Sequence, residues 1–568
     1  MKKVIVNPDR LEGFNGRGKN IVNRVVVPIN VKPIFALKLL VTAIFAAAGL
    51  FWIGVLVNSQ VASRRSDGPA NQGTRVEAQK GDDDSGREVF RFETFGTEGF
   101  WTDAVRMPQG MIAAKVTPLQ ALTLGLSVDV DALDDATKKA VAADLKADPT
   151  GRSSKLLNDP MTTVKLINAN SVIGVVIKDS NGDGTMDAMK SDKVGISCAL
   201  CHGITDGSVL NLAKGGSIGR RVDNLTNYNL NVGKILATAA NSRALYPTLQ
   251  LSLKANGGKT LGRAPKGLTE NSTEAEVDAY LSNPQFYPVG MFDDTFDGNG
   301  DPMRMVPFFR QDLAGPFGSE GMIARLDNFN NLVFTGLFDQ TTITTPGGRA
   351  LLKKLGGAAG EEIVDDYIKI LKETGVTGYP YVQAAPHPQP GSEDAPLGIR
   401  VDNKKLLDLN AYVINLEAPR GENGNRQAVK RGEESFKTIG CTACHNADQK
   451  KPVPANIIPM KTIFPGDNPV TLAQRMPPLN PVLNTSASFF DDKMAVVNAS
   501  LRGEIRGNAM PLLFELFRKP AFLHDSSVTS LDMLFDSSRG SNAPHAFYIS
   551  DARVRADIVA YLRSLDSR

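Results

Sequence analysis

Residues 198–202 read CALCH and residues 441–445 read CTACH, and these two stretches contain all four cysteines of the chain. C-x-x-C-H is the attachment signature of c-type haem, because two thiols add to the haem vinyl groups and the adjacent imidazole reaches the iron. A zinc ribbon would place its two C-x-x-C pairs about 15–20 residues apart, and a disulfide or thioredoxin-like motif needs no histidine after each second cysteine. We therefore predict two covalently bound haems c. The predicted attachment sets are Cys198, Cys201 and His202 for haem one, and Cys441, Cys444 and His445 for haem two.

The composition is that of a globular protein with several domains. The chain has 568 residues, of which 42% are hydrophobic and 22% are charged, and its net charge is +3. These values exclude intrinsically disordered and fibrous classes. A net charge so close to zero also argues against a general nucleic-acid binder, so we expect no nucleic-acid partner.

An apolar stretch lies near the N-terminus. Residues 39–57 read LLVTAIFAAAGLFWIGVLV, without a charge, and with their apolar flank they are long enough to cross a hydrocarbon core of about 30 Å. Basic residues dominate the segment before it, which places the N-terminus in the cytoplasm. The sequence thus predicts a single-pass protein of the bacterial inner membrane, with a cytoplasmic segment at 1–32, a transmembrane anchor at 33–58 and haem domains in the periplasm. A cleaved signal peptide is the alternative.

The remainder of the chain is expected to be mainly α-helical, with long loops. Residues 59–87 are polar and rich in glycine, aspartate and serine, which predicts a flexible tether. Further on, apolar residues recur at helical spacing in several segments, and no long run alternates like a half-buried strand. The expected helices are 274–282, 361–373, 404–416, 426–441 and 556–565.

The last two of these expected helices resemble the first and closing helices of a cytochrome c domain, which cross beside the haem. Gly432 and Phe436 match the first helix of that pattern, and Tyr561 and Leu562 match the second. The resemblance implies that a compact second domain surrounds the CTACH motif.

An earlier segment, 409–419 (LNAYVINLEAP), is similar to the same closing helix. It implies a first domain that ends close to residue 420. The resemblance thus predicts two cytochrome c-like haem domains, at 88–420 and 425–568, the first enlarged by long loop insertions.

Residues 520–536, PAFLHDSSVTSLDMLFD, resemble a segment of bacterial dihaem cytochrome c peroxidases, the related MauG-type enzymes and the rubber oxygenases. Two tandem C-x-x-C-H domains, each closed by a helix, are similar to the same superfamily. FGTEGFW at 95–101 and VGISCALCH at 194–202 look like a dihaem branch of it. The resemblance implies an oxidoreductase in which haem two relays electrons and haem one performs the chemistry.

A weak internal repeat links two segments at a constant offset of 205 residues. Under this register Ser319 is the counterpart of His524. The matched identical pairs are Met305 and Met510, Phe309 and Phe514, Phe317 and Phe522, Leu326 and Leu531, and Asp327 and Asp532.

The distal iron ligand of haem two has three candidates. His524 is favoured, because it lies in the segment that resembles the superfamily and because the rubber oxygenases imply a bis-histidine second haem. Met510 is the main alternative, since the distal methionine of a small cytochrome c domain lies at a similar spacing. His545 is the third candidate, although a packing or propionate-side role is the simpler interpretation.

This choice carries a functional consequence for haem one. If His524 is the ligand, its counterpart Ser319 cannot ligate well, and haem one is left open to peroxide or O₂, with Phe317 near the open face. If Met510 is the ligand, Met305 could serve haem one in the same way. Both irons would then be closed and would only exchange electrons.

Two loops resemble the start of a calcium-binding loop. The first has oxygen-bearing side chains at positions one, three, five and nine, but Lys190 takes the place of the bidentate glutamate at position twelve. A D-x-N-x-D start recurs at 297–301. Polar turns are the alternative, because Asp, Asn and Gly are the usual turn residues. The candidate calcium ligands of the first loop are Asp179, Asn181, Asp183 and Asp187.

The sequence therefore supports two functions. The leading hypothesis is a peroxidase- or oxygenase-like oxidoreductase, which the long insertions of the first domain favour. The alternative is a non-catalytic electron carrier of a respiratory chain, which is favoured by the lack of a tryptophan between the two haem motifs. Expected partners are the inner membrane, a redox protein or quinol-linked donor, and a small oxidant or substrate.

Overall fold

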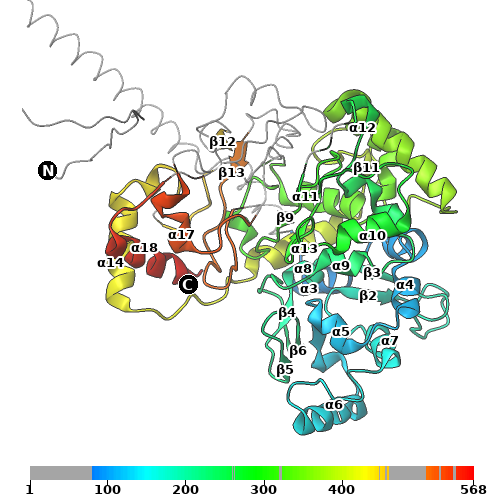
Figure 1. Ribbon diagram of the computed structural model, residues 1–568, viewed down its shortest axis with the longest axis horizontal. Coiled ribbons are helices and arrows are strands. Elements are labelled where there is room, and N and C mark those ends of the chain that lie inside the picture. The colour runs from blue at the N-terminus through cyan, green and yellow to red at the C-terminus, as the bar shows by residue number, and fades with distance from the viewer. Residues whose placement is uncertain are drawn as a thin grey trace, which may run out of the picture. The chain divides into compact units, whose positions relative to one another are not determined.

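The computed structural model describes residues 80–454, 457–459 and 507–567, apart from 259, 261, 319–320, 322, 447, 524–525, 541–544 and 546. The chain divides into two units, Met1–Gln60 and Val61–Arg568, and every described residue belongs to the second. Both predicted haem domains lie in this second unit, so the boundary near 420–425 remains a prediction. In Figure 1 the helices α14, α17 and α18 lie together in yellow to red, while the blue-to-green part of the ribbon holds most of the other helices and strands.

Helices are the main regular elements of the described chain. The expected helix at 361–373 is the second half of a longer one, α12, which kinks at Gly357 (φ 56°). The other four expected helices are present within a few residues of their predicted bounds. The α-helices are α3 (Asp83–Phe92), α4 (Met107–Ala113), α5 (Pro118–Thr123), α6 (Asp135–Ala147), α7 (Pro160–Asn168), α8 (Ala199–His202), α9 (Val232–Leu236), α10 (Glu274–Ser282), α11 (Leu326–Leu332), α12 (Pro346–Glu373), α13 (Asn403–Asn415), α14 (Arg426–Thr438), α17 (Leu531–Leu534) and α18 (Ala552–Arg563).

Short strands form small sheets between the helices. One sheet has three strands in the order β1-β6-β5, with β1 and β6 parallel, and the antiparallel pairs are β2-β3, β4-β7, β8-β9, β10-β11 and β12-β13. The strands are β1 (Val128–Asp129), β2 (Val175–Lys178), β3 (Lys193–Ile196), β4 (Ile204–Thr205), β5 (Leu210–Asn211), β6 (Ser217–Gly219), β7 (Arg221–Val222), β8 (Met291–Phe292), β9 (Met303–Arg304), β10 (Ala385–Pro386), β11 (Ile399–Arg400), β12 (Ile457–Pro459) and β13 (Gly507–Ala509).

Helices α14 and α18 cross in close contact, as the sequence predicts for the second domain. The crossing point is Gly432, where a Cβ atom would lie 2.0 Å from the main-chain oxygen of Asp557. The Asp557 carboxylate receives two hydrogen bonds from Arg431, both of 2.7 Å. Beside the crossing, the rings of Phe436 and Tyr561 lie 5.5 Å apart in the core. The backbones can approach this closely because glycine has no side chain.

The first domain repeats this arrangement with α3 and α13. A Cβ atom on Gly86 would lie 1.9 Å from the main-chain oxygen of Asp408. Asp82 caps α3, and its own amide donates to the Asp408 carboxylate at 2.9 Å. Because α3 begins at Asp83, the tether predicted for 59–87 ends too late. The acidic start of this helix suggested a loop, but acidic residues also stabilise a helix N-terminus.

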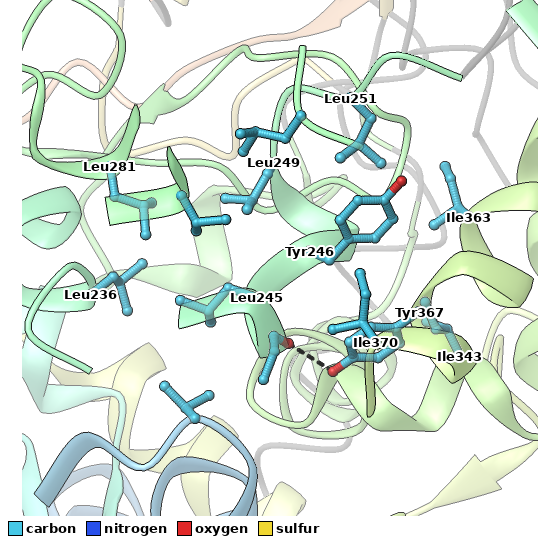
Figure 2. Packing of buried hydrophobic residues seen from close by; sticks show 14 of the residues in the cluster. Leu236, Leu245, Tyr246, Leu249, Leu251, Leu281, Ile343, Ile363, Tyr367 and Ile370 are labelled. Carbon is cyan, nitrogen blue, oxygen red and sulfur yellow. Dashed lines mark hydrogen bonds between the residues drawn. The ribbon is translucent and has the colours of Figure 1, made fainter. Parts of the chain in front are cut away.

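The largest hydrophobic core lies between α12 and the 3-10 segment Ser242–Thr248. Figure 2 shows Tyr246 and Tyr367 surrounded by aliphatic side chains of this core. Tyr367 donates from its Oη to the main-chain oxygen of Ala244 at 2.8 Å, and Tyr246 donates to Asp366 at 2.9 Å. These bonds join α12 to the segment. The long insertions of the first domain therefore carry a core of their own.

The structure supports the internal repeat. Phe317 forms an isolated β-bridge with Ile323, and Phe522 forms one with Val528, at the same offset along the chain. Helices α11 and α17 then begin at the equivalent residues Leu326 and Leu531. The matched Phe309 and Phe514 lie in one hydrophobic cluster, with ring centres 6.5 Å apart.

The membrane predictions require correction. In the described part of the chain no helix is long and apolar enough to cross a bilayer; α12, the longest helix there, carries charges such as Lys353 and Glu361 along its length. The apolar stretch at 33–58 and the segment 1–32 lie outside the described residues. The transmembrane part of the fold class, the inner-membrane partner and the single-pass, periplasm-facing location are thus not supported. The mainly α-helical prediction did not include the small sheets that the structure adds between the helices.

Replacing Gly432 with alanine should destabilise the second domain, because the added methyl group would overlap the backbone of α18. Such overpacking typically costs about 1–3 kcal/mol of unfolding free energy. Chemical denaturation followed by circular dichroism measures the change. Gly424→Ala is the matched control, since its Cβ would meet only a side-chain carbon at 3.8 Å. Equal stability of the two variants would contradict the close crossing.

Candidate haem attachment sites

The first C-x-x-C-H cluster forms one helical turn, α8, directly after strand β3. Gly174 makes room for it, since a Cβ atom there would lie 2.0 Å from the amide nitrogen of Leu200, and its φ of +75° favours glycine. Asn227 holds the turn from the other side. Its amide donates to the Cys201 carbonyl at 2.9 Å, and its side chain donates to the Leu200 carbonyl at 3.4 Å. The attachment turn is therefore fixed by backbone contacts on both sides.

The His202 imidazole is held in an apolar environment. Its ring lies 4.9 Å from the ring of Phe308, and its Nδ1 is buried without a hydrogen-bond partner. Burial lowers the pKa of His202 to about 4, so the ring is neutral at pH 7. A neutral imidazole is the form that ligates a metal. Burial also raises the pKa of Cys198 and of Cys201 to about 12.

A hydrophobic core cluster rich in phenylalanine includes Cys198 of this motif. Cys198 is 8% exposed and belongs to the same core cluster as Phe317, the residue that the sequence predicts near the open face of haem one. Methionine is absent from the described residues of this cluster, but Met305 belongs to the largest core, against which Leu200 and Cys201 of the motif also pack. Ser319 lies outside the described residues. The phenylalanines in this core cluster or packed against it are Phe90, Phe95, Phe308, Phe317, Phe329, Phe334 and Phe338.

The second C-x-x-C-H cluster follows α14 through Gly440, which has a φ of 111°. Cys441 begins a 3-10 turn, and the His445 amide donates to the Cys441 carbonyl at 3.0 Å. The His445 ring lies 6.3 Å from the ring of Phe436, the α14 residue that packs beside the helix crossing. Burial, with a smaller contribution from His545, lowers the pKa of His445 to about 4.

His545 faces this second cluster. Its ring centre lies 6.5 Å from that of His445, and its Nδ1 is buried without a partner. Metal–imidazole bonds of about 2 Å on opposite sides of one metal would separate the ring centres by about 6 Å. The spacing therefore fits two axial histidines, and burial lowers the pKa of His545 as well, which keeps it neutral.

The structure thus favours the histidine that the sequence ranks last. His524 lies outside the described residues, so its role remains a prediction, and Met510 is buried at 6% exposure. His387 lies in a polar loop, where its Nε2 is 3.1 Å from the Asp394 carboxylate. In the sequence, the signal for His545 is its place shortly before the closing helix α18. In the structure, it takes a positive φ of 54°.

Both clusters fit covalent haem by their chemistry. All four cysteines are free thiols, as addition to vinyl groups requires. Each cluster pairs its thiols with a desolvated imidazole, and buried Nδ1 atoms without partners on His202 and His545 are unusual in a finished core. His202 and His445 are thus the residues that would hold the two irons from the proximal side.

The first calcium-like loop is exposed and satisfies its own carboxylates. Asp179 accepts from the amides of Gly182 and Gly184 at 2.7 and 2.9 Å, and Asp187 pairs with Lys190 at 3.3 Å. Asn181 and Asp183 bond to each other at 3.0 Å. The part of the chain that the structure describes has no group of three or more His, Cys, Asp or Glu side chains that could hold a metal ion. Calcium binding by this loop therefore remains a prediction.

A haem attached at the second motif would be held by His445 and, in our assignment, by His545, so replacing His545 with alanine should convert that haem from low-spin to high-spin. Electron paramagnetic resonance of the ferric protein measures the change. His387→Ala is the control, since His387 lies in a polar loop. A His545→Ala protein that keeps its low-spin signal, together with a His524→Ala protein that loses it, would contradict this assignment.

No protein-family model matches the chain, and no curated protein matches it. Among solved structures, the chain is similar to a hydrazine synthase of Kuenenia stuttgartiensis. The two share 18% sequence identity with a TM-score of 0.27, over 48% of this chain and 76% of the other. A similarity this low does not establish a shared fold.

Proposed function

We propose that this protein is a dihaem c-type cytochrome that acts as an oxidoreductase, with haem one as the catalytic centre and haem two as the electron relay. One observation carries the proposal, and it is the difference between the two attachment sites. Haem two has a second imidazole, His545, 6.5 Å from His445. The described residues show no second histidine ring against His202, whose ring contact is Phe308 at 4.9 Å. Haem supplies a redox-active iron when bound, and an iron without a distal protein ligand can bind peroxide or O₂.

The residues near haem one have roles that follow from their positions. His202 is kept neutral by burial, and Phe308 packs against its ring at 4.9 Å. Phe317, with its ring 6.0 Å from that of Phe329, belongs to the apolar wall. An apolar wall keeps water away from this site.

Direct contacts between the two haem domains support the relay role. Glu515 is fully buried and accepts hydrogen bonds from the Thr226 amide at 3.2 Å and the Thr226 hydroxyl at 2.8 Å. The next residue, Asn227, donates to the Cys201 carbonyl at 2.9 Å. Arg518 pairs with the Glu515 carboxylate. The second domain is thus bonded to the residues that hold the haem-one attachment turn.

The alternative function is a non-catalytic electron carrier. It is favoured by the two methionines at equivalent repeat positions, Met305 and Met510, which are both 6% exposed. If each methionine ligated one of the two irons, the protein would exchange electrons without binding an oxidant. In either function, a redox protein or quinol-linked donor would supply the electrons.

Single-haem variants separate the two functions. In the Cys441→Ala/Cys444→Ala protein only haem one is attached, and we expect a high-spin ferric signal that shifts on addition of cyanide or peroxide. In the matched Cys198→Ala/Cys201→Ala protein only haem two is attached, and we expect a low-spin signal that does not change on addition of cyanide or peroxide. Low-spin, unreactive haem in both variants would overturn the catalytic role and leave the carrier.

A further inference from the structure

A second acidic loop, in the hairpin between β8 and β9, differs from the exposed calcium-like loop in its burial. Its sequence at 293–302 is DDTFDGNGDP. Asp293 is 1% exposed and Asp297 is 5% exposed. The loop packs on the largest core, since the amide of Leu251 donates to the Gly298 carbonyl at 2.8 Å. Two carboxylates are therefore buried at the edge of an apolar core.

These two carboxylates converge. The Thr295 hydroxyl lies 3.2 Å from Asp293 Oδ1 and 3.1 Å from Asp297 Oδ1, although a hydroxyl group has one proton to donate. Within the described residues, neither carboxylate forms an ion pair with lysine, arginine or histidine. Burial raises the pKa of Asp293 well above its usual range, and it raises that of Asp297 to about 6. Buried charges without a counter-charge are costly.

A tyrosine from α10 points into the same loop. Tyr280 is 5% exposed, and its Oη is buried without a hydrogen-bond partner. That Oη lies 2.9 Å from the position of a Cβ atom on Gly300, between Asn299 and Asp301. Buried polar atoms without partners are rare, and each one calls for an explanation such as a missing ion. Tyr280 is an observation independent of the acidic residues.

We propose that this loop binds one calcium ion through the carboxylates of Asp293 and Asp297 and the amide oxygen of Asn299. The donors are all hard oxygens, which calcium prefers and zinc does not. The Thr295 hydroxyl supplies a further neutral oxygen beside the two carboxylates, and Tyr280 lies at Gly300 of the same loop. The buried carboxylate of Asp301 lies 3.5 Å from the same Thr295 hydroxyl, beside the proposed ligands. The described residues have no group of three or more His, Cys, Asp or Glu side chains that could hold a metal ion, so the proposed site uses two carboxylates and neutral oxygens.

The site has a structural consequence. Asn299 bonds to Asp297 through its own amide at 2.9 Å and its side chain at 3.1 Å, and the Tyr287 hydroxyl accepts from the Asp293 amide at 2.9 Å. Tyr280 and Tyr287 both belong to the core that carries the insertions of the first domain. The ion would thus stabilise that core. This proposal does not depend on the haem chemistry.

The test is a calcium titration of the full-length, haem-loaded protein after treatment with a chelator. Isothermal calorimetry should give one saturable site, and calcium should raise the midpoint of thermal unfolding by several degrees. The Asp293→Asn/Asp297→Asn protein should bind at least tenfold more weakly and lose the thermal shift, because both charges are removed while the side-chain shapes are kept.

The matched control is Asp179→Asn/Asp183→Asn, which removes two charges from the exposed loop. It should bind calcium as the parent protein does. If the Asp293→Asn/Asp297→Asn protein fails to fold, calcium binding by the parent protein alone tests the proposal. Metal analysis and tyrosine-sensitised terbium emission, which Tyr280→Phe should reduce, must then report one bound ion. No calcium binding by the parent, or loss of binding only in the Asp179→Asn/Asp183→Asn protein, would overturn the proposal.

Discussion

The architecture depends on two helix crossings at which the backbones touch. At Gly86 and at Gly432 a side chain would meet the main-chain oxygen of the closing helix at 1.9 and 2.0 Å. In both places that oxygen belongs to an aspartate whose carboxylate is bonded to the first helix or its cap, Asp408 to Asp82 and Asp557 to Arg431. The same solution thus appears twice in one chain, once for each haem motif. In the second domain the crossing places Phe436 next to His445.

The local parts of this structure are predictable from sequence. The C-x-x-C-H motifs predict haem attachment directly. Helices with a regular apolar spacing, such as α10 and α13, begin and end close to their predicted bounds. The repeat between Phe317 and Phe522 is also visible in the sequence, because identical residues recur at one offset. Helix α3 escaped prediction because its polar start is typical of a tether, and its apolar face packs against distant residues of α13 and Phe308.

Contacts between distant residues explain what the sequence did not predict. His545 is separated from His445 by a long segment, and the fold brings their ring centres within 6.5 Å. The two acidic loops also differ in a way that the sequence does not predict, namely in the burial of their carboxylates. Their patterns of Asp, Asn and Gly are alike, yet Asp183 is exposed and Asp297 is buried. Burial follows from the fold, and it decides whether a carboxylate needs a counter-ion.

Covalent attachment of haem at both motifs is the central claim of this account. It is tested most directly by mass spectrometry of the intact protein and of its proteolytic peptides. The account predicts a mass higher than that of the polypeptide by two haems, with one haem on the peptide containing Cys198 and Cys201 and one on the peptide containing Cys441 and Cys444. An intact mass equal to that of the bare polypeptide, from cells that mature c-type cytochromes, would contradict it.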